Sequence, residues 1–225
     1  MDPKRRFLLK SALASGVGGA LLGAPALSRA ASGLNPASSV ATLLLSSDAA
    51  VEASFGAGVQ AALGNGTSLR KLRADHSNLL DPAVAALNSG RPIRLIGMVD
   101  DALGELLIAQ ARRAGARLHW LGEHAISRGQ TRHQVINSQG TQGAALELGE
   151  QLQHSPAGFA LSARQPFSHK RNLDLAGKRA GRLSTRWASH LGYALAAPGA
   201  VVDSATLELR SERLEGHFVS FVIEV

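Results

Sequence analysis

The chain has 225 residues and contains no cysteine. This length is enough for one domain with a substantial core, whereas the lack of thiols excludes structural disulfides, thiolate-ligated iron–sulfur clusters, covalently attached c-type haem and a catalytic cysteine. The formal net charge is +7, but the first 30 residues hold five of the 24 basic side chains and one of the 17 acidic ones. The remaining excess of +3 and the 4% of aromatic residues give no support to nucleic-acid binding.

The first 30 residues have the features of an export signal. Residues 4–10 read Lys-Arg-Arg-Phe-Leu-Leu-Lys, and residues 11–27 are weakly apolar but too rich in glycine for a membrane span. Ser28-Arg29-Ala30 has the small-x-small pattern of a signal-peptidase site. With its arginine pair, the segment resembles a twin-arginine (Tat) signal peptide. An ordinary Sec signal with two basic residues is the alternative.

The resemblance to a Tat signal implies a protein that folds in the cytoplasm, passes through the Tat translocase and works in the periplasm. Many proteins on this route carry a cofactor or travel bound to a partner that does. We expect residues 1–30 to be the signal, cleaved near Ala30, residues 31–39 a linker, and residues 40–225 a single α/β domain without a membrane span. Any cofactor would be held noncovalently or through His, Asp, Glu or backbone groups.

The first part of the predicted domain alternates strands and helices. Strands are predicted over residues 39–46 and 68–74, and helices over residues 49–63 and 80–87. The unbroken apolar run within residues 39–46 is typical of a buried parallel strand. Gly58 belongs to a GxGxxA spacing that begins too far beyond its strand for a dinucleotide site. We interpret it as a small residue that lets its helix pack closely.

The clearest unit lies in the middle of the chain. Residues 92–99 are predicted as a strand, and Asp100 or Asp101 caps a helix that ends with Arg-Arg-Ala-Gly at residue 115. Residues 117–121 resume a strand. This order predicts a βαβ unit with a right-handed crossover.

The remaining elements complete an α/β fold. They are a short strand at 133–137, a polar loop at 137–143, helices at 144–152 and 175–195, and hairpin strands at 205–210 and 217–225. The sequence therefore predicts a Rossmann-like, three-layer architecture. Its sheet is mainly parallel, flanked by helices and extended by a C-terminal antiparallel hairpin.

Acidic or imidazole side chains follow each predicted parallel strand. Ligands of open α/β sheets bind outside the carboxyl ends of the strands, so we expect these side chains to form one ligand-binding rim. The predicted rim residues are Asp75, His76, Asp100, Glu123 and His124. Because mixed nitrogen and oxygen ligands suit a divalent metal, His76, Asp100 and His124 are the candidate metal ligands.

A simpler interpretation of these residues is structural. An aspartate after a strand commonly caps the following helix, and Asp48 and Asp101 both occupy such positions. His119 is interpreted as a packed residue of its strand, whereas His124 and His133 are interpreted as loop residues.

Two further segments are candidate binding sites. The loop at 137–143 leads into a helix, and its small residues Gly140, Thr141 and Gly143 predict a backbone seat for an anion. Helix capping by Ser138 or Thr141 is the alternative.

The second segment is basic. Lys178, Arg179, Arg182 and Arg186 belong to the helix predicted at 175–195. On one helix face they would suit an acidic partner, an anionic ligand or a membrane surface, and a solvated helix face is the alternative.

Two hypotheses about function follow. The first is a noncatalytic periplasmic protein that binds a small anionic ligand, a cofactor or an exported redox partner at the rim of the sheet. The second is a metal-dependent hydrolase that uses the same rim.

Overall fold

The computed structural model describes residues 40–64, 67–74, 81–127, 129–163, 173–181, 184–200 and 213–225, apart from the side chains of residues 142, 179 and 180. All of these residues belong to one compact unit, Ser38–Val225. The predicted signal and linker, at residues 1–39, lie outside the described residues.

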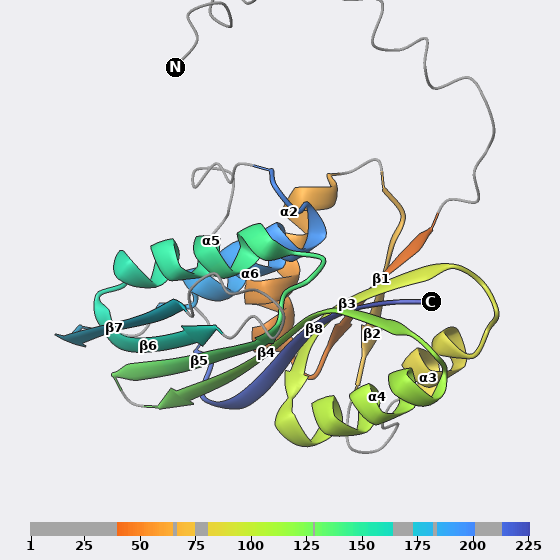
Figure 1. The fold of residues 1–225 in the computed structure, drawn as a ribbon, viewed down its shortest axis with the longest axis horizontal. Helices are drawn as coiled ribbons and strands as arrows, with labels where there is room; N and C mark the ends of the chain where they lie inside the picture. The colour runs from red at the N-terminus through yellow and green to blue at the C-terminus, as the bar shows by residue number, and fades with distance from the viewer. Residues whose placement is uncertain are drawn as a thin grey trace, which may run out of the picture. The chain divides into compact units, whose positions relative to one another are not determined.

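Within this part of the chain, eight strands form one sheet with helices on both faces, so the protein is α/β (Figure 1). The strands are β1 (Ala41–Ser46), β2 (Leu69–Arg73), β3 (Ile93–Asp100), β4 (Arg117–Ser127), β5 (Gln130–Asn137), β6 (Ala157–Ala163), β7 (Leu173–Ala180) and β8 (Gly216–Glu224). The helices are α1 (Ala49–Val51), the π-helical turn η3 (Glu52–Gly56), α2 (Ala57–Leu63), α3 (Asp81–Leu87), α4 (Asp101–Arg113), α5 (Gln142–Gln153) and α6 (Arg186–Ala196).

The sheet is mixed, with more antiparallel than parallel pairings. Its strand order is β2-β1-β3-β8-β4-β5-β6-β7. Strand β1 is parallel to β2 and β3, and β5 is parallel to β6, whereas β8 is antiparallel to both β3 and β4. The β4–β5 and β6–β7 pairs are also antiparallel. The prediction of a mainly parallel, Rossmann-like sheet is therefore wrong.

The position of β8 explains much of this difference. Its residues Phe218 to Ile223 are all buried, which is typical of a strand in the interior of a sheet with cover on both faces. Strand β8 therefore lies between β3 and β4 rather than in a hairpin at the edge of the sheet. The partner predicted for it, residues 205–210, lies outside the described residues.

The unit β3–α4–β4 confirms the predicted order of strand, helix and strand, but β8 separates its two strands.

The helix predicted at 175–195 is wrong in its first part. Residues 173–178 alternate between partly buried and exposed side chains, and this period of two belongs to strand β7. Helix α6 begins only at Arg186.

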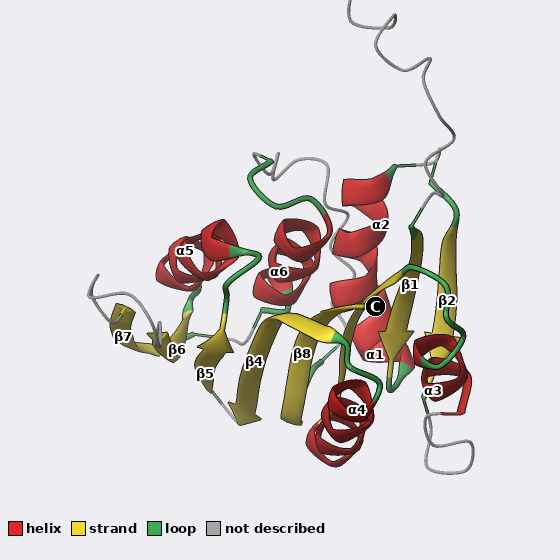
Figure 2. Cartoon of the chain, turned by 45° about the vertical axis from the view of Figure 1, so that its right-hand side comes forward, coloured by secondary structure: helices red, strands yellow, loops and turns green. Residues whose placement is uncertain are grey.

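The helices cover the two faces of the sheet unequally (Figure 2). Helices α2, α5 and α6 pack on one face over a core that includes Phe55, Trp120 and Trp187. Helices α3 and α4 cover the other face, where Leu95, Leu107 and Phe221 belong to a second core. On the side of the sheet that carries α3 and α4, no helix of the described residues covers strands β5, β6 and β7. None of the described helices is long and apolar enough to cross a membrane.

Candidate functional site

The predicted rim is formed only in part. Asp75 and His76 lie outside the described residues. Asp100 ends β3, and its carboxylate accepts a hydrogen bond from the backbone N–H of Leu103 at 3.1 Å. Asp48 accepts one from the N–H of Val51 at 2.8 Å. Capping of the next helix is thus the role of Asp48 and Asp100, while Asp101 is the first helical residue.

Strand β4 is longer than predicted, and this separates Glu123 from His124. The strand continues to Ser127 and turns into β5 at Gly129, where φ is 76°. Glu123 and His124 are therefore mid-strand residues on opposite faces of the sheet. His124 and His133 are not loop residues, because they pair with each other across β4 and β5 and are buried.

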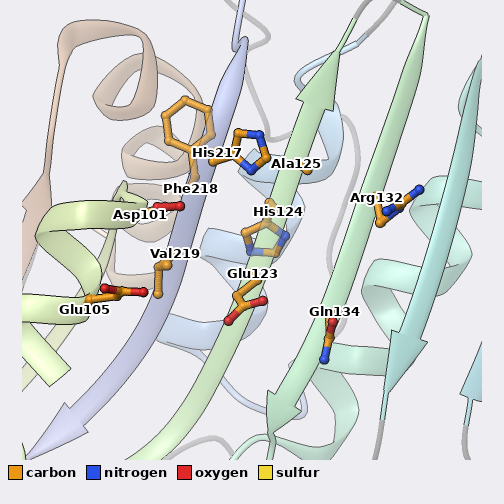
Figure 3. Close-up of a pocket in the computed structure, with 10 residues that line it drawn as sticks. All are labelled: Asp101, Glu105, Glu123, His124, Ala125, Arg132, Gln134, His217, Phe218 and Val219. Atoms are coloured by element: carbon orange, nitrogen blue, oxygen red, sulfur yellow. The ribbon is translucent and has the colours of Figure 1, made fainter. Parts of the chain in front are cut away.

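Glu123 lines a pocket of about 290 Å³ (Figure 3). The pocket lies between α4 and the face of β4, β5 and β8 that points away from α5 and α6. Its lining residues are Asp101, Glu105, Glu123, His124, Ala125, Arg132, Gln134, His217, Phe218 and Val219.

The periodicity of each element brings these residues together. Asp101 and Glu105 are one turn apart on α4 and so share a helix face. Glu123 pairs with Gln134 of β5 and with Val219 of β8, whereas Ala125 pairs with Arg132 and with His217. These are alternate positions along each strand, and their side chains point to one face of the sheet.

The charged side chains of the pocket are exposed and have no partner among the described residues. Asp101, Glu105, Glu123 and Arg132 are all exposed. Within the described part of the chain, none of them makes an ion pair or a side-chain hydrogen bond. Three carboxylates and one guanidinium thus line the pocket, around a floor that includes Ala125 and Val219.

A buried polar network lies behind the pocket, on the other face of β4. His124 Nδ1 is 2.9 Å from His133 Nδ1, and His124 Nε2 is 2.7 Å from Ser220 Oγ. Ser220 Oγ also accepts a hydrogen bond from Trp120 Nε1 at 2.8 Å. The indole of Trp187 packs on both imidazoles, with ring centroids 5.0 Å from His124 and 4.6 Å from His133.

Burial keeps both imidazoles neutral. It lowers the pKa of His124 from 6.5 to about 3. The pKa of His133 also falls well below 6.5, because of burial and the neighbouring His124. Although His124 also borders the pocket, both rings are buried against Trp187 of α6, so the network stabilises the packing of β4 and β5 under this helix.

The candidate metal ligands do not converge in the described chain. Asp100 is engaged as a helix cap, and each ring nitrogen of His124 has a neighbour within hydrogen-bond distance. Among the described residues, no group of three or more His, Asp or Glu side chains could hold a metal ion. His76 lies outside those residues.

The loop before α5 has a packing role at Gly140. A Cβ atom there would lie 2.4 Å from Nδ1 of His119, so the imidazole requires a glycine. His119 Nε2 lies 3.1 Å from Glu224 Oε2, in agreement with the packed role predicted for it. Thr141 is buried at the N-cap of α5 but makes no capping hydrogen bond through its side chain. Gly143, in the first turn of α5, has open space around it.

The loop and the pocket are separate features, because neither Gly140, Thr141 nor Gly143 lines the pocket. The anion seat at this loop stays a prediction.

The described residues of the predicted basic helix face do not share one helix. Lys178 is an exposed residue of β7, and Arg186 is the first residue of α6. Arg182 and the side chain of Arg179 lie outside the described residues.

Several pocket residues were not singled out from the sequence. No recognisable sequence motif contains Glu105, Arg132, Gln134 or His217. A signal was nevertheless present in β5, where polar Arg132 and Gln134 alternate with the buried Thr131, His133 and Val135. That alternation indicates a sheet with one solvent-facing side.

Fold and pocket together define an α/β protein with a mixed sheet and a polar pocket on its partly uncovered face. No family model matches the chain, and no curated protein or solved structure matches it either. The evidence for function is therefore the chemistry of the site.

Proposed function

We propose that the protein is a noncatalytic binding protein that holds a small charged ligand in the pocket between α4 and strands β4, β5 and β8. The observation that carries this proposal is the set of charged side chains on the pocket lining, namely Arg132, Asp101, Glu105 and Glu123, which have no partner among the described residues. A volume of about 290 Å³ is close to the lower end of typical small-molecule sites.

The exposure of the lining supports binding rather than catalysis. Enzyme sites commonly exclude water, because charges act more strongly on a transition state in a dry environment. Here the charged side chains are exposed, and the buried histidines are neutral and lie on the opposite face. These features favour reversible capture of a ligand from solution.

Export to the periplasm by the Tat route, with cleavage near Ala30, is part of the same proposal and rests on residues 4–30 of the sequence. A role beside an exported redox enzyme rests on that signal alone. Replacing Arg5 and Arg6 by lysine should retain the uncleaved protein in the cytoplasm, which cell fractionation with immunoblotting detects. Unchanged processing would indicate the Sec route instead.

A defined ligand panel tests the binding function. We expect at least one class among amino acids, diamines, mono- and dicarboxylates, monosaccharides and nucleoside monophosphates to raise the melting temperature of the purified protein. Ala125→Trp fills the pocket and should abolish that shift. Ala176→Trp, at an exposed position of β7 away from the pocket, should preserve it.

The proposal fails if no class produces a shift, or if the shift persists in the Ala125→Trp protein. Recovery of chemically altered ligand, followed by NMR of the solution, would instead identify an enzyme.

A further inference from the structure

The charges of the pocket are arranged with opposite signs on opposite sides. Figure 3 places Asp101 and Glu105 on the α4 side, Arg132 on the β5 side and Glu123 between them. Strands β8 and β5 are two strand spacings apart, with β4 between them. The backbones of these two strands are therefore about 10 Å apart, and α4, which carries Asp101 and Glu105, packs against β8 where Gly104 meets Val219. A ligand with a chain of five or six atoms can span the pocket with the help of the long charged side chains.

The charges also do not balance. Three carboxylates and a single guanidinium line the pocket, and none of the four groups is paired within the described part of the chain. A ligand that contacts all four groups carries one negative group for Arg132 and at least two positive groups for the carboxylates, where Asp101 and Glu105, one turn apart on α4, share one of them. A purely anionic ligand would leave the carboxylates unpaired and be repelled by them.

The floor of the pocket suits a short hydrocarbon chain. Val219 is buried and Ala125 is half-buried, and both lie on the strands between the charged walls. Methylene groups that cross this floor would remove apolar surface from water. Gln134 and His217 add polar groups at the same face.

We propose that the pocket recognises a diamino carboxylic acid of about the size of lysine. Its carboxylate binds Arg132, and its two ammonium groups bind Glu123 and the Asp101–Glu105 pair. This inference rests on the proposed binding function and deepens it by naming the ligand class.

Titration calorimetry with three matched compounds tests the assignment on the purified protein. L-lysine has all three charges, cadaverine lacks the carboxylate, and L-norleucine lacks the second ammonium group. We expect L-lysine to bind about three- to tenfold more tightly than either of the others, because each lost contact is a partly exposed charge pair.

Variants assign each charge to its partner. Arg132→Gln should weaken L-lysine to the affinity of cadaverine and leave cadaverine itself unchanged. Glu123→Gln should weaken both compounds. The matched controls are Lys178→Gln and Asp174→Asn, two exposed charges of β7 outside the pocket, and neither should alter binding.

The outcomes distinguish failure of this ligand assignment from failure of the proposed binding function. Equal binding of L-lysine and cadaverine, with no effect of Arg132→Gln, would overturn the ligand class but keep the pocket as a binding site. Failure of all three compounds would also overturn it, and the wider ligand panel would then decide whether the pocket binds anything.

Discussion

His124 and His133 show how burial decides what a histidine can do. Both imidazoles lie under Trp187, and their shared contact at 2.9 Å places one beside the other in the core. From the sequence they are interpreted as loop residues, and the strand before His124 is predicted to end at residue 121, directly before Gly122 and Glu123. Glycine and glutamate are both uncommon in strands. Pairing with β5 and β8 overrides that local preference.

These buried histidines make the fold sensitive to acid. The pKa of each is lowered in the folded protein, so only the unfolded chain takes up a proton as the pH falls below 6.5. Stability is therefore complete above about pH 6.5 and decreases below it, by about 1 kcal/mol per pH unit for each histidine.

Urea unfolding at about pH 7.5 and about pH 5.5 measures this effect. We expect a loss of about 2 kcal/mol over that range. The loss should be roughly halved in a His133→Leu variant and unchanged in His217→Gln, which removes an exposed histidine. Equal stability at both pH values would show that the imidazoles are not held neutral in the core.

At the scale of elements, α2 and α6 touch through glycine. A Cβ at Gly58 would lie 1.8 Å from the carbonyl oxygen of Ser189, and one at Gly192 would lie 2.2 Å from that of Phe55. The predicted packing role of Gly58 is therefore confirmed. Phe55 belongs to η3, which runs directly into α2, so the backbone of α6 approaches both η3 and α2 too closely for any side chain at these positions.

Gly58→Ala should destabilise the protein by about 2 kcal/mol or more, because the helices must move apart. The control is Gly143→Ala in α5, where no atom lies within 4 Å of the added methyl group. That change should be neutral or stabilising by up to about 1 kcal/mol, since alanine favours a helix. Similar effects of the two substitutions in urea unfolding would contradict the close contact between α2 and α6.

Local signals predicted some elements well and others poorly. The unit β3–α4–β4 was predicted from its aspartate cap and its Arg-Arg-Ala-Gly ending, which are local chemistry. The apolar run of β8 identified a strand, but its neighbours depend on pairing between residues about 100 positions apart. For β7, the spacing by four of Leu183, Trp187 and Leu191 suggested a helix that begins at residue 175, although residues 173–178 alternate as a strand does.

The same limit applies to the candidate site. Glu123 was identified, yet Arg132 reaches the pocket through the pairing of β4 with β5, and His217 and Glu105 reach it only because β8, on which α4 packs, lies next to β4. Strand order could not be derived from the sequence. The set of residues that line the pocket could therefore not be predicted from the sequence either, even where individual residues were identified.

At the scale of the whole molecule, the uneven cover of the sheet creates the pocket. Helices α5 and α6 bury one face of the second half of the sheet, whereas α4 reaches only the nearer strands on the other face (Figure 2). Because the described residues place no helix over this face of β5, β6 and β7, the charged side chains that β4 and β5 carry there are exposed. The position of the site is thus a consequence of the fold.

Titration of the ¹⁵N-labelled protein with L-lysine, followed by two-dimensional NMR, tests the central claim most directly. We expect the largest shifts at the amides of Glu123, Arg132 and His217, which line the pocket from three strands. Shifts centred on the loop from Gly140 to Gly143, or no shifts at saturating lysine, would contradict the account.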